Sequence, residues 1–261
     1  ILITGATGFK GAWLSYWLHI LEAKVVGVGR KPNKNDNLFK QLDLKKKIKI
    51  EYFDIREKKK LEKVIKNFKP SIIFHLAAQP IISEGYKNPE ETIMVNSIGT
   101  LNIVEICRAL KFVKSIVCVT SDKCYQNNFS TRGFKENDKL GGSDPYSASK
   151  ANAEIIVKSY LESFYYDKKI GLATGRAGNV IGGGDWSPNR LIPDCIKWII
   201  KNKLIFLRRP KFNRPWQHVL EPLNGYLILA YKLYNDPKKY SGAWNFGSKK
   251  GTVTSVFEVV K

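Results

Sequence analysis

The sequence lacks a long apolar run: none reaches the roughly 18 residues that a membrane-spanning helix needs. The first segment also has no basic region ahead of an apolar one, as a secretory signal would have. We therefore expect a soluble, cytoplasmic protein that does not enter a membrane. The chain begins at Ile1 within a strand pattern and stops at Lys261 within a helix pattern, so we expect a fragment trimmed at both ends.

Cysteine is scarce, and internal repeats and low-complexity linkers are absent. None of the cysteines shows the paired spacing of a metal site. One lies in a helix pattern and another in a strand pattern, which favours buried reduced thiols over disulfides or metal ligands. The four are Cys107, Cys118, Cys124 and Cys195. A chain of 261 residues with 43% hydrophobic content can form one large α/β domain with a small lobe.

Acidic residues are outnumbered, which gives a formal net charge of +21. The lysine runs at residues 45–47 and 58–60 have no aromatic residues between them, so they are typical of a solvated surface and not of a nucleic-acid patch. The positive charge does favour the approach of an anionic ligand such as a nucleotide. We therefore expect a small-molecule partner and no nucleic acid.

A glycine-rich turn follows the apolar strand pattern of residues 1–4 and precedes a helix pattern at 12–21. Gly5, Gly8 and Gly11 have the spacing G-x-x-G-x-x-G. The first glycine allows a tight turn, the second lets the backbone approach a pyrophosphate, and the third lets helix and strand pack closely. This turn predicts a dinucleotide site with phosphates at the helix N-terminus.

The second strand pattern, residues 24–28, ends without the acidic residue that would bind the adenosine ribose of NAD. Arg30 and Lys31 stand there instead. Arg30 could bind a 2′-phosphate, which would favour NADP, or it could lie over the adenine. The sequence leaves these alternatives open.

Two further strand patterns, residues 49–53 and 71–76, lead into candidate cofactor contacts. Asp54 follows the first and could bind an adenine amino group or cap a helix. Small residues at 77–78 follow the second and leave room for a ribose and a nicotinamide. His75 lies inside the apolar strand, where a hydrogen-bonded core histidine is the expected role.

Three reactive side chains follow the strand pattern of residues 115–120: Ser121, Asp122 and Lys123. Polar groups at the end of a buried strand suggest an active site at the carboxyl edge of a sheet. Tyr146 and Lys150 come later, four residues apart in a helix pattern, so they share one helix face. We expect the lysine to lower the pKa of the phenol and make it a general base for a hydroxyl.

The alternation of strand and helix patterns predicts an α/β fold, a Rossmann-like, doubly wound parallel sheet with a smaller C-terminal lobe. The expected units are residues 1–179 for the cofactor, 180–240 for the substrate, and 241–261 as a strand returning to the sheet and the start of a helix. Further helices are expected over residues 57–68, 91–110, 146–164 and 195–201, and strands over residues 171–176 and 204–207.

Several of these motifs resemble the extended short-chain dehydrogenase/reductases that act on nucleotide sugars. They are Thr-Gly-x-x-Gly-Phe-x-Gly, Tyr-x-x-x-Lys and the region of Asn179. Within that family the chain is similar to the CDP-glucose 4,6-dehydratases in TGATGFKGAWL, HLAAQP, TSDKCYQN, DPYSASK, RAGNVIGGGDW, RLIPD and RPWQHVLEPLNGY. The Ser121-Asp122-Lys123 run is distinctive, since the related dTDP-glucose and GDP-mannose dehydratases carry Glu after the Asp. The similarity spans the whole chain.

The resemblance implies a hydro-lyase that converts CDP-glucose to CDP-4-keto-6-deoxyglucose with internally recycled NAD, for deoxysugar or O-antigen synthesis. Tyr146, aided by Lys150 and Ser121, would take the O4 proton while the C4 hydride leaves. Asp122 would then act as the acid and a neutral Lys123 as the base for elimination of water across C5 and C6, and the hydride would return to C6.

The resemblance also implies the binding residues. The expected NAD site consists of Gly5, Thr7, Gly8, Phe9, Gly11, Arg30, Asp54, Ile55, Ala77, Ala78, Gln79, Asn96, Thr120, Tyr146 and Lys150. Of these, Asn96 is expected to brace the sheet edge. The expected nucleotide-sugar contacts are Asn179, Arg190, Arg208, Arg214 and His218. A homodimer built on the helices at 92–110 and 148–164 is expected as well, with no metal.

Two alternatives remain from the sequence. One is another nucleotide-sugar 4,6-dehydratase or a 4-epimerase acting on a UDP-, dTDP- or GDP-sugar, although an epimerase has no need of the Asp122 and Lys123 pair. The other is an NAD-sensing or RNA-binding protein without catalysis, suggested only by the charge of +21.

Overall fold

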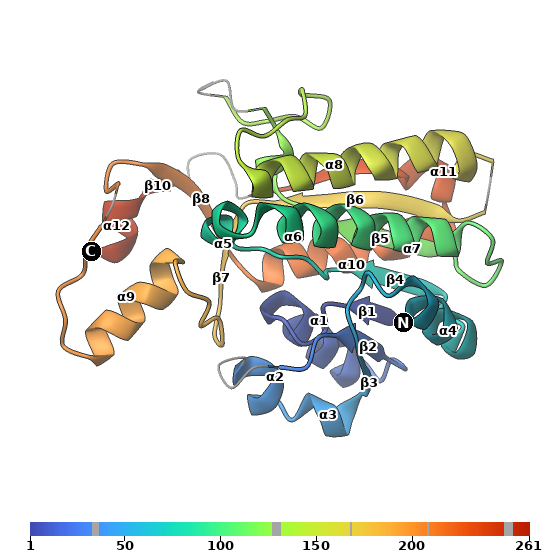
Figure 1. The fold of residues 1–261 in the computed structure, drawn as a ribbon, viewed down its shortest axis with the longest axis horizontal. Helices are drawn as coiled ribbons and strands as arrows, with labels where there is room; N and C mark the ends of the chain where they lie inside the picture. The colour runs from blue at the N-terminus through green and yellow to red at the C-terminus, as the bar shows by residue number, and fades with distance from the viewer. Residues whose placement is uncertain (33–36, 127–131, 168, 208, 248–252) are drawn as a thin grey trace.

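A seven-stranded parallel sheet in the order β3-β2-β1-β4-β5-β6-β9 forms the centre of the molecule (Figure 1). The computed structural model describes residues 1–32, 37–126, 132–167, 169–207, 209–247 and 253–261. The strands are β1 (Leu2–Thr4), β2 (Val26–Gly29), β3 (Lys49–Tyr52), β4 (Ile72–His75), β5 (Ser115–Val119), β6 (Gly171–Ala177) and β9 (Gly242–Phe246). Every neighbouring pair runs parallel, which confirms the predicted doubly wound sheet.

The strand order reverses at β1, because the chain proceeds to β2 and β3 on one side and to β4, β5, β6 and β9 on the other. Connections that leave β1 and β4 therefore diverge at their carboxyl ends, and a crevice for a ligand is expected between them. The glycine-rich turn lies at this point of the sheet.

Two helical layers cover the sheet because successive strand residues face opposite sides. Leu2 and Ile116 belong to the core on one face, and their neighbours Ile3 and Val117 belong to the core on the other. Helices α4 (Lys58–Phe68), α7 (Gly99–Cys107) and α8 (Pro145–Tyr160) cover the first face, and α1 (Phe9–Ile20) and α10 (Leu220–Asn235) cover the second (Figure 1).

A second sheet of three strands, in the order β10-β8-β7, lies beyond the carboxyl ends of the central strands together with α9 and α12 (Figure 1). Its strands are β7 (Asn179–Ile181), β8 (Asn213–His218) and β10 (Val253–Ser255). The chain enters it from β6 through Gly178. A Cβ atom built at Gly178 would lie 3.0 Å from a Pro215 carbon and 3.7 Å from an Asp122 carboxylate oxygen, so the two sheets meet beside Asp122.

The remaining elements are short. They are α2 (Asn37–Gln41), α3 (Leu44–Lys47), α5 (Ile82–Lys87), α6 (Pro89–Ile93), the π-helical turn η1 (Met94–Ile98), the 3₁₀ turn η2 (Asp122–Cys124), the π-helical turn η3 (Leu161–Tyr165), α9 (Leu191–Ile200), α11 (Pro237–Tyr240) and α12 (Val256–Val260). No helix within the described ranges has the length and apolarity to cross a membrane.

The strand predicted at residues 204–207 is wrong. Leu204 is 96% exposed and Phe206 is 72% exposed, and these residues belong to no strand. An apolar run forms a strand only when a neighbouring strand pairs with it, and the sequence pattern does not show whether one does. The helix expected over residues 91–110 forms as three successive pieces, α6, η1 and α7, and α5 was not predicted.

Helix α10 lies within the range predicted for the smaller lobe, residues 180–240, yet it packs on the central sheet. Leu223 and Tyr226 are fully buried there with Ile3 and Val117. The second sheet and α9 are the parts of this range that stand beyond the strand ends (Figure 1).

The turn between β1 and α1 depends on two glycines. Gly5 has a φ of 73°, a left-handed conformation that side chains other than glycine rarely adopt. A Cβ atom on Gly11 would lie 2.0 Å from the carbonyl oxygen of Gly5. The helix can therefore approach the strand end only if residue 11 has no side chain.

We predict that Gly11→Ala destabilises the protein by about 1–3 kcal/mol or more, because the methyl group overlaps backbone that cannot move without opening the turn. Thermal unfolding should show a Tm lowered by about 2–4 °C per kcal/mol. Gly133→Ala is the matched control, since a Cβ atom there meets nothing within 4 Å. Equal Tm values for the two variants would contradict the close approach.

Candidate active site

The glycine-rich turn presents the N-terminus of α1 at the carboxyl edge of the sheet. Gly8 is the N-cap residue and supplies no side chain to bond the first amide groups of the helix. Those free N–H groups and the positive end of the helix dipole form a site for a phosphate. Phe9 packs into the core beneath the turn, and the Thr7 hydroxyl donates a 3.0 Å hydrogen bond to the carbonyl of Arg30. The turn is thus fixed to the end of β2, where the Arg30 side chain is exposed.

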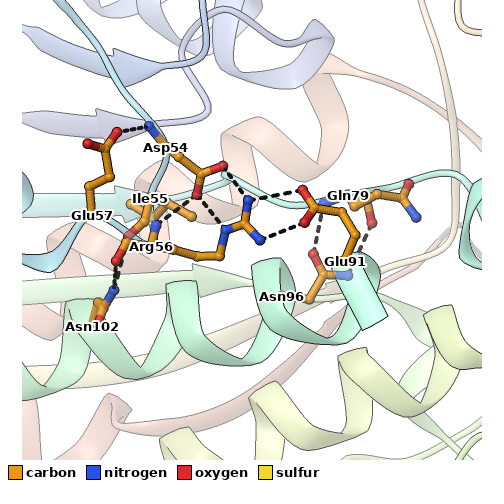
Figure 2. Close-up of polar contacts among 8 residues, drawn as sticks. All are labelled: Asp54, Ile55, Arg56, Glu57, Gln79, Glu91, Asn96 and Asn102. Atoms are coloured by element: carbon orange, nitrogen blue, oxygen red, sulfur yellow. Dashed lines mark hydrogen bonds and ion pairs between the residues drawn. The ribbon is translucent and has the colours of Figure 1, made fainter. Parts of the chain in front are cut away.

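Asp54 follows β3 and forms an ion pair with Arg56 (Figure 2). Arg56 donates to both carboxylate oxygens of Asp54 at 2.9 and 3.0 Å and to Glu91 at 2.6 Å. These hydrogen bonds hold the pKa of Asp54 below its usual value. Asp54 also accepts from the backbone of Arg56, but the N-cap of α4 is Glu57, so Asp54 is not a helix cap.

The neighbouring Ile55 is buried in the core, and Asn102 of α7 donates to its carbonyl at 3.1 Å (Figure 2). The backbone at Ile55 is therefore held both by the packing of the Ile55 side chain and by the hydrogen bond from Asn102.

Asn96 holds the segment after β4 in place (Figure 2). Its side chain accepts from the backbone N–H of Gln79 at 2.8 Å, donates to the Gln79 carbonyl at 3.1 Å, and donates to Ser149 of α8 at 2.8 Å. The Gln79 side chain bonds Thr92 and the Ile81 carbonyl, and Ala77 and Ala78 lie half-buried before it. This segment therefore offers backbone and small side chains toward the crevice.

His75 is a core residue, as expected. It is 3% exposed, and its two ring nitrogens lie 2.7 Å from the Thr4 hydroxyl and 3.2 Å from the Thr100 hydroxyl. Burial and the charge of Lys150 lower its pKa to about 3, so the ring is neutral at physiological pH.

Ser121, Asp122 and Lys123 form a hydrogen-bonded group in η2 at the end of β5. The Ser121 hydroxyl donates to Asp122 at 3.1 Å and accepts from the backbone of Lys123 at 3.2 Å. Lys123 Nζ lies 3.0 Å from the other carboxylate oxygen of Asp122. Both side chains of this ion pair are about one-third exposed, so they line the open side of the site.

Tyr146 reaches the same group from the first turn of α8. The helix begins with Pro145 after an N-cap Asp144 that accepts from the Ser147 backbone at 3.0 Å. Tyr146 is 8% exposed and Lys150, one turn later, is 5% exposed. The Ser121 hydroxyl is close enough to act on the Tyr146 phenol and opposes the rise of its pKa. The structure therefore brings together all five residues predicted for catalysis.

The electrostatics differ from the sequence-based expectation for Tyr146. Burial raises the pKa of its phenol to about 12, against the lowering effects of the Ser121 hydrogen bond and the Arg190 charge. Burial also lowers the pKa of Lys150 to about 8, and the Glu154 carboxylate opposes that shift. The expectation that Lys150 sets a low pKa at Tyr146 is wrong for this structure, since removal from water dominates both groups.

The expectation for Lys123 concerns only the elimination step, at which its amine must be neutral. The structure places its Nζ in an ion pair with Asp122.

The predicted substrate residues that the structure describes lie in the second sheet and at the start of α9. Asn179 pairs with Trp216, and Ile181 with His218, so Asn179 and His218 lie on adjacent strands. Arg214 of β8 is half-buried, with its guanidinium 5.6 Å from the Phe212 ring.

Arg190, the N-cap of α9, bonds Asp185 at 2.7 Å, and its charge reaches Tyr146. Arg208 lies outside the described residues. The four cysteines are buried and free, and within the described ranges no group of three or more His, Cys, Asp or Glu residues could hold a metal ion.

The family described as GDP-mannose 4,6 dehydratase matches residues 2–241 of this chain. The chain belongs to that family. A CDP-glucose 4,6-dehydratase from Salmonella typhimurium is 42% identical over 100% of this chain and 74% of its own length. A UDP-glucose 4-epimerase from Mycoplasma genitalium is 26% identical over 100% of this chain and 79% of its own length. The predicted resemblance to the nucleotide-sugar enzymes of the extended short-chain dehydrogenase/reductases is confirmed.

Solved structures share the fold of this dehydratase-family chain. A dTDP-glucose 4,6-dehydratase from Streptomyces venezuelae with NAD and TYD bound superposes with a TM-score of 0.82, at 19% identity over 99% of this chain and 78% of the other. MoeE5 in complex with UDP-glucose and NAD gives a TM-score of 0.81 at 24% identity, over 99% and 78% of the two chains.

The site of this dehydratase-family protein contains one cation that sequence reasoning missed. Lys10 is the second residue of α1, and its ammonium lies 5.8 Å from the centre of the Tyr226 ring. Burial, together with repulsion from Arg190 and Lys150, lowers its pKa to about 7, while Asp122 opposes the shift. The signal was a lysine inside the Gly-Phe-Lys-Gly turn, which we had interpreted only through its glycines.

We predict that Lys10→Met stabilises the protein at pH 6.5. The folded protein binds the Lys10 proton less tightly than the unfolded chain, so the ammonium destabilises the fold fully below pH 7, and the penalty disappears as the pH rises toward 10.5. We expect a gain of about 1–3 kcal/mol at pH 6.5, measured as a higher Tm, and a smaller gain at pH 9.5.

Lys63→Met, at an exposed position of α4, is the control and should leave Tm nearly unchanged. A gain from Lys10→Met that is equal at both pH values would show that the buried charge is not the cause.

Proposed function

We propose that this protein is a CDP-glucose 4,6-dehydratase that forms CDP-4-keto-6-deoxyglucose. The observation that carries the proposal is the Asp122–Lys123 pair, 3.0 Å apart, beside Ser121 and the buried Tyr146. Oxidation at C4 needs a base at the O4 hydroxyl, and loss of water across C5 and C6 needs an acid and a base together. The identity of 42% along the whole chain to the Salmonella CDP-glucose enzyme supports the same substrate.

The chain is suited to bind NAD. The residues that would hold its pyrophosphate are the glycines of the turn, where the backbone can approach closely, and the uncapped N-terminus of α1. Asp54 and Ile55 would lie at the adenosine end, where Arg30 can contact the adenine or a 2′-phosphate, and Ala77 and Ala78 at the nicotinamide end. When bound, NAD accepts a hydride from C4, returns it to C6, and in its oxidised form adds a positive charge to the site.

Tyr146 would remove the O4 proton during oxidation. Its pKa of about 12 is that of a buried phenol, so its ionised form depends on favourable neighbours. The Ser121 hydrogen bond and the Arg190 charge already act in this direction, and Lys150 stands one turn away on the same face of α8. Ser121 can also bond O4 itself, since its hydroxyl lies between Tyr146 and Asp122.

Asp122 and Lys123 would divide the elimination between them. As an ion pair they have the wrong protonation states for an acid at the 6-hydroxyl and a base at C5. Transfer of one proton from the Lys123 ammonium to the Asp122 carboxylate, across their 3.0 Å contact, creates both required forms at once. Exclusion of water by bound substrate favours the neutral pair over the ionic one.

The contacts of the nucleotide sugar would come from the second sheet and α9. Arg190 and Arg214 can bind the diphosphate through forked hydrogen bonds. Asn179 lies on β7, which is paired with β8, the strand of Arg214 and His218. We propose a division of the chain into residues 1–179 for the cofactor, 180–240 for the substrate and 241–261 as the returning strand and the start of a helix. Within the second range, α10 packs on the central sheet. A homodimer and a role in deoxysugar or O-antigen synthesis are proposed from the resemblance alone, and a cytoplasmic location from the sequence pattern.

We predict that the full-length protein, supplied with NAD, converts CDP-glucose and leaves dTDP-glucose, UDP-glucose and GDP-mannose largely unchanged. Proton NMR would follow loss of the C6 hydroxymethyl signal and growth of a C6 methyl doublet. A methyl doublet formed from another nucleotide sugar would show that the substrate differs from the one proposed while the reaction is the same. Formation of a C4 epimer without a methyl signal would favour an epimerase.

Lys123→Met should stop elimination and leave oxidation at C4. We expect the methyl product to fall about 10²–10⁴-fold, the range attributed to one general acid–base group. A 4-keto sugar that keeps its 6-hydroxyl should be trapped by borohydride and identified by NMR. Asp122→Asn should cause the same block if the two residues exchange a proton. Lys60→Met, on the exposed side of α4, is the control. Normal methyl formation by Lys123→Met would remove Lys123 from the mechanism.

A further inference from the structure

A buried carboxylate that the proposed mechanism does not use lies one helical turn behind Lys150. Tyr146, Lys150 and Glu154 follow each other at intervals of four residues, so they line one face of α8. All three are buried, and Glu154 is only 3% exposed. A carboxylate this far from water must be bonded by other groups if it is to remain charged.

Glu154 accepts hydrogen bonds from the ends of two neighbouring strands. Thr120, which follows β5, donates to one carboxylate oxygen. Thr174 and Arg176 of β6 both donate to the other oxygen at 2.7 Å. One side chain thereby ties α8 to two strands at the edge where the active site lies.

The partner Arg176 extends this link to the chain after η2. It is 4% exposed, and its second terminal nitrogen donates to the Tyr125 hydroxyl at 2.7 Å and to the Glu136 carbonyl at 2.9 Å. Tyr125 donates in turn to Asn245 of β9 at 2.6 Å. Glu154 therefore has a fully buried counter-ion that is itself fixed.

These contacts determine the spacing of the catalytic groups. Ser121 is one peptide bond from Thr120, and Tyr146 is two helical turns from Glu154. The contact between Thr120 and Glu154 therefore links the strand end that carries Ser121 to the helix that carries Tyr146. Loss of the hydrogen bond between Thr120 and Glu154 would let α8 move relative to the end of β5.

We propose that Glu154 is a positioning residue for catalysis, whose buried carboxylate fixes α8, the helix that carries Tyr146 and Lys150, against the end of β5 and against β6. This inference rests on the proposed function only for its kinetic readout. Since Glu154 is bonded on both oxygens within the protein, it acts through Lys150 and Tyr146 and not on the substrate.

The charge of Glu154 gives a readout that a purely structural residue would not have. It raises the pKa of Lys150, while burial lowers it. The other groups that face Lys150 are Cys118 of β5 and Cys124 of η2, which act in the same direction as Glu154, and His75 of β4 and Lys10 of α1, which the Lys150 charge affects. Removal of the Glu154 charge should therefore let Lys150 lose its proton at lower pH.

The test follows Lys150 directly in the full-length protein labelled with [ε-¹³C]lysine, with its signal assigned by its loss in Lys150→Met. In Glu154→Gln we expect the midpoint of the Lys150 titration to fall by about one pH unit. In the same variant we expect kcat for formation of the methyl product to fall at least about tenfold, with little change in KM. The alkaline limb of the pH profile of kcat should move to lower pH.

Two further variants separate charge from folding. Thr174→Val removes one hydrogen bond to Glu154 and no charge, so the Lys150 midpoint should not move. Glu154→Gln leaves Arg176 buried and unpaired, which can prevent folding. The double variant Glu154→Gln/Arg176→Met removes both buried charges and should fold, with the lowered Lys150 midpoint retained.

An unchanged Lys150 midpoint in both variants that lack Glu154 would overturn the proposal. Full recovery of kcat in the double variant would also overturn it. That result would show that the unpaired Arg176, and not the loss of Glu154, lowers the activity of Glu154→Gln. If the wild-type protein converts none of the nucleotide sugars, the proposed function fails, yet the titration still decides whether Glu154 controls Lys150.

Discussion

Three elements of the active site meet at the single buried carboxylate of Glu154. Strands β5 and β6 and helix α8 each contribute a group, and every oxygen of the carboxylate is bonded. A buried ion pair such as Glu154–Arg176 adds little net stability, because the desolvation of two charges offsets most of their attraction. Its effect lies in geometry: the hydrogen bonds are directional, and water cannot replace them at 3–4% exposure. Ser121 and Tyr146 hold their places because the strand end and the helix that carry them share this anchor.

The charges around the catalytic group are unbalanced toward the positive. Lys10, Lys150 and Arg190 repel one another, and burial lowers the pKa of Lys10 to about 7 and of Lys150 to about 8. Each ammonium therefore has a free-energy cost that an arriving anion can relieve. A ligand with a diphosphate meets these cations at the edge of the sheet, where the uncapped N-terminus of α1 adds partial positive charge. The net charge of +21 acts over longer distances and favours the encounter of an anion, while Lys150, which is buried, and Lys10 and Arg190, which are partly buried, would favour it at close range.

The sequence predicted what depends on local pattern and missed what depends on burial. Strands such as β5 and β6 could be predicted because their residues are apolar and end in glycine or polar groups, and Gly5 and Gly11 because only glycine fits such a turn. The apolar residues 204–207 failed because strand pairing is not a local property. The five catalytic residues could be predicted from spacing, but the pKa of Tyr146 could not, since spacing shows the nearby lysine and not the loss of water. Glu154 was overlooked for the same reason: a charged residue in a helix pattern looks exposed until its neighbours in space are known. Lys10 was overlooked because the turn that contains it was interpreted through its glycines.

The arrangement separates the chemistry of the site from recognition of its substrate. The groups proposed for catalysis lie in α8 and in η2 at the end of β5, beside the central sheet, whereas Asn179, Arg214 and His218 belong to the second sheet. The two parts meet at Gly178, where a side chain would press on Pro215 and approach Asp122. Substitutions in the second sheet can therefore alter which nucleotide is held without moving the proton-transfer groups. In the proposed function, elimination differs from epimerisation in its need for an acid and a base at C5 and C6, and the Asp122–Lys123 pair lies on the side of the central sheet, where it would supply both.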